Sequence, residues 1–367
     1  MRVALVGDEY PPVTGGAAVY ARELALHLSR LGVEVVVFTR EGAEGEGVEV
    51  RELRGFGLFH RSLSPRLFGE LRRELRSGGF SVVHGTDMYS PLSLAAVRFA
   101  RGAGLPSVVT CHSVHHSSGL WRAVHLPLTL LLRRADRVIA VSGASKEFCC
   151  SLGVPGERVE VVPNGVDPSL FHRGVDGGGF RRRLGVGEGE RLVATAIRLV
   201  KRKGPHLLLR AFSELAGEFP GLRLAVAGEG PEEGELRRRV EEEGLDGRVL
   251  LLGRLPHGEV AGLMAGADLF VLPSSVEAFG LAAVEAMAVG TPVVCPRAGG
   301  ILEFGRDGYN CLMFEPGDPS SLREAMARLL SDGRLARTLR LGGLRTARRF
   351  TWERTARLTL RVYRGIA

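Results

Sequence analysis

The sequence predicts an α/β protein in which two doubly wound parallel sheets form successive units. Short β-branched runs recur along both halves of the chain and alternate with helical patterns, which is typical of parallel strands joined by helical crossovers. The 367 residues exceed what one ordinary hydrophobic core organises and fit two domains. With 45% apolar and 25% charged residues, the composition is that of a soluble globular protein.

The order of the expected elements supports this fold class. In the first half, the β-branched runs predict strands at residues 2–6, 33–39, 81–84, 107–110, 137–141 and 158–162. Helical spacing of apolar residues predicts helices at 17–31 and 92–101. The pattern restarts with strands expected at 192–196, 222–227, 248–252, 269–272 and 292–296, and helices at 204–218, 232–243 and 280–288. The two series predict two Rossmann-like units.

A proline-flanked Asn-Gly turn at residues 162–168 separates the two series and is typical of a rigid elbow. We therefore expect an N-terminal domain at 1–165 and a C-terminal domain at 166–348. The Arg-rich end, 349–367, is expected to form a helix that packs back on the first domain. Ligands of such sheets bind beyond the carboxyl ends of the strands, so two facing units would enclose a cleft.

The formal net charge of +8 comes from basic residues that are mostly scattered among acidic ones, which disfavours a nucleic-acid partner. Local basic clusters at 61–76 and 121–137 fit either an amphipathic face on an anionic membrane or an ordinary solvated helix face. No targeting segment is evident and the longest apolar window, 126–132, cannot span a bilayer. A cytoplasmic protein is expected, with peripheral contact to the inner face of the membrane as an alternative.

Cysteine usage predicts neither a disulfide framework nor a metal site. The five cysteines form an odd set without the spacing of metal ligands. They are expected to be reduced thiols without chemical roles.

Two glutamates, Glu277 and Glu285, lie eight residues apart in a run rich in Ala and Leu. The run predicts a buried helix, where a carboxylate is costly unless something binds it. If both ride on that helix, its rise separates them by roughly 12 Å, which suits one extended anionic ligand held at both ends. Glu277 alone would also fit a favourable charge at a helix start.

A basic segment follows the first strand of the second series. Arg198 ends the strand, and Lys201 and Lys203, two of the only three lysines, precede a helix. A guanidinium and an ammonium at such a turn would cradle a diphosphate, although a surface charge run has the same appearance. After another strand, Gly228 and Gly230 could bring the backbone against a ligand.

The first unit offers a glycine pair and a histidine. The loop at 7–16 is too long and too rich in proline for a nicotinamide-binding fingerprint, which argues against a dehydrogenase. Gly15 and Gly16 at the following helix would admit an anion or sugar hydroxyls, or simply form a turn. His112 follows a strand, where sheets present ligands. With His115 and His116 it lacks the spacing of metal ligands on a regular element, so no metal site is expected.

Taken in order, these motifs resemble the retaining glycosyltransferases of family 4, which have the two-domain GT-B architecture. The resemblance covers essentially the whole chain. It rests on 12–16, His112, 163–167, Arg198 with Lys203 and Gly204, 228–231, 277–280 with Glu285, and Gly299 with Gly300. Departures are Leu302, where the family often has proline, and Asn310-Cys311, where it often has Asn-Gly.

The resemblance implies that 1–165 is an acceptor-binding domain and 166–348 a nucleotide-sugar-binding domain, and it implies a role for each motif. Arg198 and Lys203 would neutralise the donor diphosphate, Glu277 would contact the donor sugar and His112 would touch the same sugar. Glu285 would bind the ribose, and Gly15 with Gly16 would lie between donor and acceptor. Further donor contacts are implied for Gly228, Gly230, Ala278, Phe279, Gly280 and Leu281.

The implied reaction moves a hexose or N-acetylhexosamine from a nucleotide diphosphate sugar to a hydroxyl acceptor by front-face substitution. The acceptor would be a glycan, a lipid-linked molecule or a small molecule. No cofactor and no essential metal are expected, and the sequence has no D-x-D pair. Alternatives are a non-catalytic nucleotide-sugar-binding protein, or a GT-B epimerase or phosphorylase; the usual carboxylate-rich centre of the former enzyme and the cofactor lysine site of the latter are missing.

Overall fold

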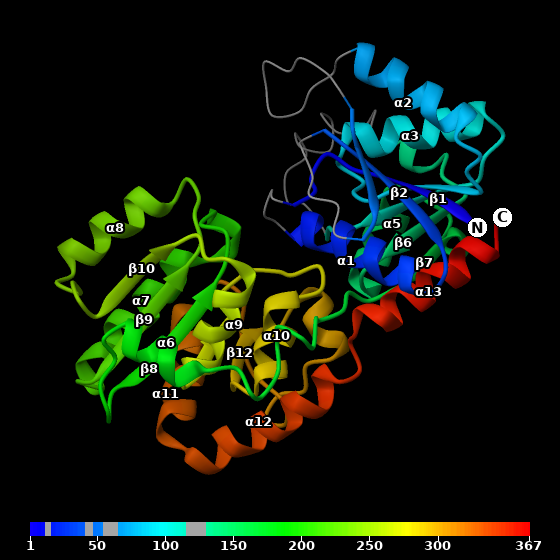
Figure 1. Ribbon diagram of the computed structural model, residues 1–367. Helices are drawn as coiled ribbons and strands as arrows, with labels where there is room; N and C mark the ends of the chain where they lie inside the picture. Colours follow the sequence, from blue (N-terminus) through cyan, green and yellow to red (C-terminus); the bar gives the residue numbers. More distant parts are fainter. Residues whose placement is uncertain (12–15, 41–46, 54–64, 115–129) are drawn as a thin grey trace. The chain divides into compact units, whose positions relative to one another are not determined.

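The computed structural model describes residues 1–11, 16–40, 47–53, 65–114 and 130–367 (Figure 1). The chain divides into two compact units, Met1–Gly165 with Trp352–Ala367 and Val166–Thr351. Each unit is built on a parallel sheet, so the predicted α/β class is confirmed.

The sheet of the first unit has seven parallel strands in the order β3-β2-β1-β4-β5-β6-β7. The strands are β1 (Arg2–Val6), β2 (Glu34–Thr39), β3 (Glu49–Glu52), β4 (Val82–Gly85), β5 (Ser107–Cys111), β6 (Arg137–Ala140) and β7 (Val159–Val161). Strand order reverses between β1 and β4, so a ligand crevice is expected where these two strands end.

Helices cover both faces of this sheet: α1 (Gly16–Arg30), α2 (Pro65–Ser77), α3 (Pro91–Gly102), α5 (Gly143–Ser151), α13 (Trp352–Arg364) and the 3-10 turn η1 (Gly156–Arg158). Helices α2 and α3 lie on one face, and α1 and α13 lie together on the other (Figure 1). Leu67, Leu71 and Leu75 of α2 are buried in the core. The apolar side of this basic helix is therefore occupied by the sheet, as in an ordinary solvated helix.

The last helix, α13, is fixed to the first sheet by a buried chain of hydrogen bonds. The Tyr363 hydroxyl lies 2.6 Å from His84 Nδ1, and His84 Nε2 lies 2.7 Å from Thr110 Oγ1. Thr110 in turn bonds the Tyr20 hydroxyl of α1 at 2.8 Å. The Trp352 ring packs against Tyr20 with centroids 6.0 Å apart. Residues from the end of the chain thus complete the core of the first unit.

The second sheet has six parallel strands in the order β10-β9-β8-β11-β12-β13. The strands are β8 (Arg191–Ala196), β9 (Leu222–Ala227), β10 (Val249–Gly253), β11 (Leu269–Val271), β12 (Val293–Pro296) and β13 (Leu312–Phe314). The helices are α6 (Gly177–Arg183), α7 (Pro205–Glu218), α8 (Glu233–Glu242), α9 (His257–Gly266), α10 (Leu281–Val289), α11 (Pro319–Ser331) and α12 (Gly333–Ala347), with 3-10 turns η2 (Lys201–Lys203) and η3 (Gly299–Glu303). Order reverses between β8 and β11, which places the second crevice at their carboxyl ends.

The expectation that one helix carries both glutamates is wrong. Helix α10 begins at Leu281, after Gly280 with φ of 93°, so Glu277 lies in the preceding loop and only Glu285 is helical. A left-handed residue cannot continue a right-handed helix, and the glycine therefore separates the two carboxylates into different elements.

Within the described residues, no helix has both the length and the apolar character needed to cross a bilayer.

Acid is expected to destabilise the fold through His84. Burial, with a smaller contribution from His112, lowers the pKa of His84 from 6.5 to about 3. The unfolded chain binds a proton at His84 more tightly than the folded chain does. The contribution of neutral His84 to the free energy of unfolding is therefore fully present above pH 6.5 and is lost as the pH falls toward 3. We expect denaturant unfolding to show a loss of about 1.4 kcal/mol per pH unit from this group. His84→Asn should reduce the slope, and an unchanged slope would contradict the assignment.

Candidate functional site

The predicted residues of the second unit gather at the carboxyl ends of its strands. Arg198 follows β8, Gly228 follows β9, Glu277 follows β11 and Gly299 follows β12. Since β8 and β11 are paired neighbours where the strand order reverses, the loops after them meet at the crevice.

A largely buried ion pair joins these two loops. Lys203 Nζ lies 2.5 Å from Glu277 Oε1, with the side chains 17% and 11% exposed. The family resemblance implied that Lys203 binds a diphosphate and Glu277 a sugar; the structure brings the two side chains together. Each keeps hydrogen-bonding capacity, because an ammonium has three N–H donors and a carboxylate has a second oxygen. One pair can therefore serve an anion and a hydroxyl at adjacent points.

Arg198 presents a positive charge at the same crevice. Its side chain is exposed, and within the described part of the chain it forms no ion pair. The backbone beside it is held by the loop after β9, since Leu199 N–H donates to the Glu229 carbonyl at 2.9 Å and Glu232 N–H donates to the Leu199 carbonyl at 3.0 Å. This guanidinium is available to a ligand from a fixed backbone.

Gly228 and Gly230 pack closely against the backbone of residues 197–199. A Cβ at Gly228 would lie 1.8 Å from the Ile197 carbonyl oxygen, and one at Gly230 would lie 2.4 Å from that of Leu199. These two glycines therefore have a structural reason at this position that the sequence did not indicate. They let the loop pack against the backbone on either side of Arg198.

Gly299 and Gly300 fix the backbone that carries Glu277. The Gly300 N–H donates to the Glu277 carbonyl at 2.8 Å. A Cβ at Gly300 would lie 2.1 Å from the Ala278 carbonyl oxygen, so only glycine permits this approach. The dipeptide positions Glu277 through its main chain.

The start of α10 offers backbone donors. Gly280 precedes the helix and no side chain caps it. The Phe279 ring packs on Phe304 and Phe350, with centroids 5.6 and 5.4 Å away, so its side chain belongs to the core. Residues 278–281 can therefore contribute main-chain groups, and an uncapped helix N-terminus favours an anion.

Glu285, buried on α10, has a partner that sequence reasoning missed. His257 Nε2 lies 2.9 Å from Glu285 Oε1. The imidazole ring packs edge-on against the buried Phe171, with centroids 4.8 Å apart. His257 opens the helix that follows β10, and a histidine just beyond a strand end was the available signal.

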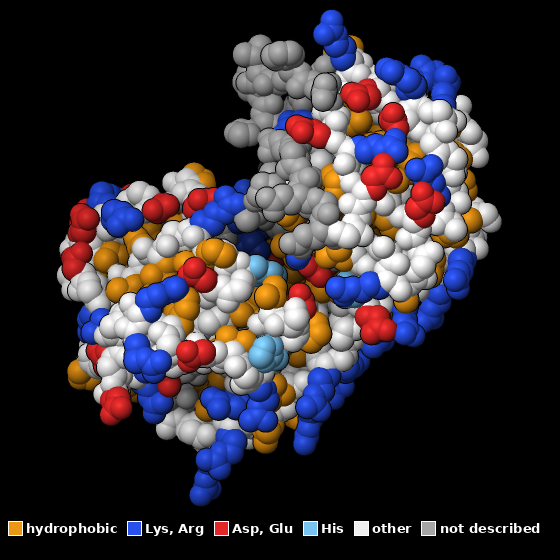
Figure 2. Space-filling model, in the orientation of Figure 1, with side chains coloured by type: hydrophobic (Ala, Val, Ile, Leu, Met, Phe, Trp, Pro, Cys, Tyr) orange, Lys and Arg blue, Asp and Glu red, His pale blue; other side chains and the backbone are white. Residues whose placement is uncertain are grey.

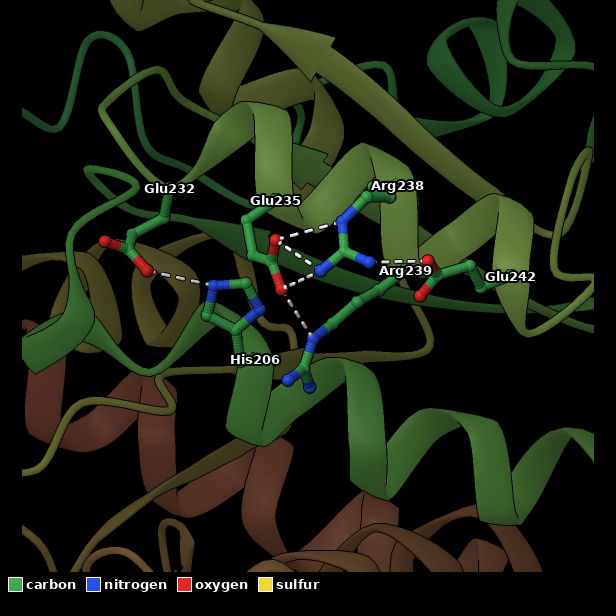
Figure 3. A network of polar contacts seen from close by, with 6 residues as sticks. All are labelled: His206, Glu232, Glu235, Arg238, Arg239 and Glu242. Atoms are coloured by element: carbon green, nitrogen blue, oxygen red, sulfur yellow. Dashed lines mark hydrogen bonds and ion pairs between the residues drawn. The ribbon is translucent and has the colours of Figure 1, made fainter.

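A second missed histidine joins the start of α7 to the loop after β9. His206 Nε2 lies 3.0 Å from Glu232 Oε2, as Figure 3 shows. His206 lies in the first turn of α7, and Glu232 follows the loop at 228–231. The contact ties together the two segments that flank Arg198 and Lys203.

In the first unit, His112 lies at the end of β5. Its Nε2 is 3.1 Å from the Thr86 carbonyl, and because a carbonyl only accepts, Nε2 carries the hydrogen. Burial lowers the pKa of His112 to about 4 despite that hydrogen bond. The ring is therefore neutral at pH 7, and Nδ1 is left as an acceptor.

Gly16 and His112 belong to one region of the first unit. Gly16 opens α1, and Tyr20, one turn later, meets the His112 ring edge-on with centroids 4.4 Å apart. Gly15 lies outside the described residues, as do His115 and His116. Across the part of the chain that is described, no group of three or more His, Cys, Asp or Glu side chains could hold a metal ion.

The arrangement agrees with similarities to known proteins. A family model described as Glycosyl transferases group 1 matches residues 179–343, and one described as Glycosyltransferase Family 4 matches residues 14–170. The chain is 32% identical over 386 residues to D-inositol 3-phosphate glycosyltransferase 1 of Catenulispora acidiphila, covering 96% of this chain and 91% of the relative. It is 30% identical over 386 residues to the uncharacterized glycosyltransferase MJ1607 of Methanocaldococcus jannaschii, covering 99% and 98%.

A solved structure shares the fold. The crystal structure of Anabaena Alr3699/HepE in complex with UDP-glucose has a TM-score of 0.85 and 23% identity, covering 100% of this chain and 99% of that one.

Gly300→Ala tests how Glu277 is positioned. The added methyl group would clash with the Ala278 carbonyl, so we expect a loss of about 1–3 kcal/mol in unfolding free energy. Gly234→Ala is the matched control, because a Cβ there meets nothing within 4 Å in helix α8. It should be neutral or stabilising by about 0.5–1 kcal/mol. Equal stability of Gly300→Ala and wild type in denaturant would refute the close approach.

A double-mutant cycle tests the contact between His257 and Glu285. Removing the imidazole leaves a buried carboxylate without that donor, so His257→Ala should cost about 1–3 kcal/mol in unfolding free energy. In the Glu285→Gln background the same change should cost clearly less. Additive losses in the two backgrounds would show that the pair is not coupled.

Proposed function

Since the chain belongs to glycosyltransferase family 4, we propose that it moves a hexose or N-acetylhexosamine from a nucleotide diphosphate sugar to a hydroxyl acceptor, with retention of anomeric configuration. The family and the two-sheet GT-B architecture give the reaction class. The observation that carries the proposal is the Lys203–Glu277 ion pair at the crevice of the second sheet.

The charges around this pair fit a donor with an anionic centre. Arg198 and Lys203 supply cationic donors to the diphosphate, and the uncapped start of α10 supplies backbone N–H groups. Glu277 accepts from the hydroxyls of the donor sugar. Glu285, held by His257, accepts from the ribose.

The proposed step is a front-face substitution. The bond between the anomeric carbon and the diphosphate oxygen breaks, and the acceptor oxygen bonds to the same face of that carbon. The departing oxygen takes the acceptor's proton, so no enzyme nucleophile is needed. Arg198, Lys203 and the α10 amides stabilise the charge that develops on the leaving group. No metal and no cofactor have a part in this proposal.

The first unit is proposed to hold the acceptor. The neutral His112 offers Nδ1 to a hydroxyl of the donor sugar, and Gly16, at the start of α1, is proposed to lie between donor and acceptor. A relative named for D-inositol 3-phosphate and a fold neighbour solved with UDP-glucose make these two compounds the first acceptor and donor to test. Lipid-linked acceptors form the next group, because a membrane-bound acceptor stays among the proposed classes.

We place the reaction in the cytoplasm. All five cysteines are free thiols, which is usual in a reducing compartment.

Nucleotide release from a panel of nucleotide sugars, with and without inositol phosphate, tests the proposal. One donor should yield nucleoside diphosphate and a glycosylated acceptor with the same anomeric configuration, read by NMR. Glu277→Gln should lower kcat/KM by about 100-fold or more, because a contact to the reacting sugar is lost. Glu188→Gln, an exposed glutamate of the same unit, is the control and should leave the rate unchanged.

Tight donor binding without release under all acceptor conditions would instead support a nucleotide-sugar-binding protein. Interconversion of the donor without transfer would support an epimerase. Either result would overturn the transferase proposal.

A further inference from the structure

The exposed side of α12 is unusually basic. Residues 334–349 contain six arginines and no acidic residue, in a chain whose formal net charge is +8. Arg334, Arg337, Leu341, Arg345 and Arg348 are all exposed, and their spacing of three or four residues places them on one helical face. We call these five residues the α12 face. Figure 2 shows Lys and Arg side chains along the lower edge of the molecule, where Figure 1 draws α12.

The orientation of this face is fixed by the opposite side of the helix. Leu339, Gly342, Gly343 and Thr346 are buried, and α12 packs against α10. A Cβ at Gly342 would lie 2.1 Å from the Tyr309 carbonyl oxygen, so the two backbones are in close contact. The helix cannot rotate to bury its arginines without breaking this packing.

Helix α8 shows how the same unit treats arginines elsewhere. Arg238 pairs with Glu235 at 2.7 Å and with Glu242 at 2.5 Å, and Arg239 pairs with Glu235 at 3.2 Å (Figure 3). Arg237 pairs with Glu233 at 3.4 Å. Each arginine of α8 therefore has a carboxylate one turn away.

The α12 face has much less neutralisation, since Arg334 alone of its arginines interacts with a carboxylate, that of Asp332, in the described part of the chain. Among the described residues, none of its four arginines forms an ion pair, whereas Asp332 caps the helix by accepting from the backbone N–H groups of Arg334 and Leu335. Like charges one turn apart destabilise a helix. A row of unpaired guanidiniums about 21 Å long is thus a local cost that an anionic partner would remove.

We propose that the α12 face docks on an anionic phospholipid surface. Guanidinium groups bind phosphate oxygens in pairs, and basic side chains on one helix face are drawn to anionic headgroups. Leu341, 50% exposed in the middle of the face, would enter the boundary of headgroups and acyl chains. A nucleic-acid partner would favour aromatic side chains for base stacking, and the face has none.

This docking surface belongs to the second unit, whereas the basic clusters at 61–76 and 121–137 belong to the sequence of the first. It directly backs α10, which carries Glu285. Vesicle binding is measured without donor or acceptor. A protein that does not bind vesicles can therefore still catalyse the proposed transfer, and one that does not catalyse transfer can still bind vesicles.

Co-sedimentation of the full chain with vesicles tests the proposal. Wild type should bind phosphatidylcholine vesicles that contain phosphatidylglycerol, and should bind weakly to phosphatidylcholine alone or at high salt. The triple variant R334Q/R337Q/R345Q should partition about 100-fold less, which corresponds to about 1 kcal/mol for each arginine. Leu341→Ser should lower binding several-fold at both salt concentrations.

The matched control is R237Q/R238Q/R239Q in α8, which lowers the net charge by the same amount. It should retain nearly all vesicle binding, and thermal unfolding should show that both triple variants are folded. Equal loss in the two triple variants would overturn the proposal, because total charge would then explain binding. So would equal binding to neutral and anionic vesicles, no binding, or displacement from vesicles by structured RNA at the same salt.

Discussion

The ion pair between Lys203 and Glu277 connects the two loops on which the second unit's site is built. One partner follows β8 and the other follows β11, and both side chains are largely removed from water. Leaving either charge without the other would be expensive, so the position of each loop depends on the other. The backbone beneath Glu277 is in turn set by Gly300. A ligand that binds this pair therefore meets a preorganised arrangement, which is the condition for electrostatic stabilisation of a transition state.

The architecture was largely readable because buried parallel strands are continuous β-branched runs. Strand β1 was predicted with its observed bounds, and β9 likewise. Two edge strands were missed for opposite reasons. Strand β3, Glu-Val-Arg-Glu, is mostly charged and looks like a loop, whereas β13, Leu-Met-Phe, is too short to show a period. The helix assigned to Glu277 failed because composition predicted a helix where one left-handed glycine prevents it.

The types of residue that form the site could be predicted from the sequence, but their interaction partners mostly could not. Carboxylates and cations at strand ends pointed to the crevice, but pairing depends on distances across the chain that a pattern does not contain. Lys203 and Glu277 are 74 positions apart, and His257 and Glu285 are 28 apart. The presence of a motif also says little about which of its atoms face a ligand. The ring of Phe279 proved to be core, which leaves its main chain for binding.

The docking of α13 sets an order of events in biosynthesis. The first unit consists of residues 1–165 and 352–367, so its final helix is made only after the whole of the second unit has been synthesised. Until then His84 lacks its hydrogen bond to Tyr363, and Tyr20 lacks its contact with the Trp352 ring. Domains usually fold in sequence order during translation. Here the second unit can finish folding first. The first unit completes its core last, when α13, synthesised after the second unit, packs against it.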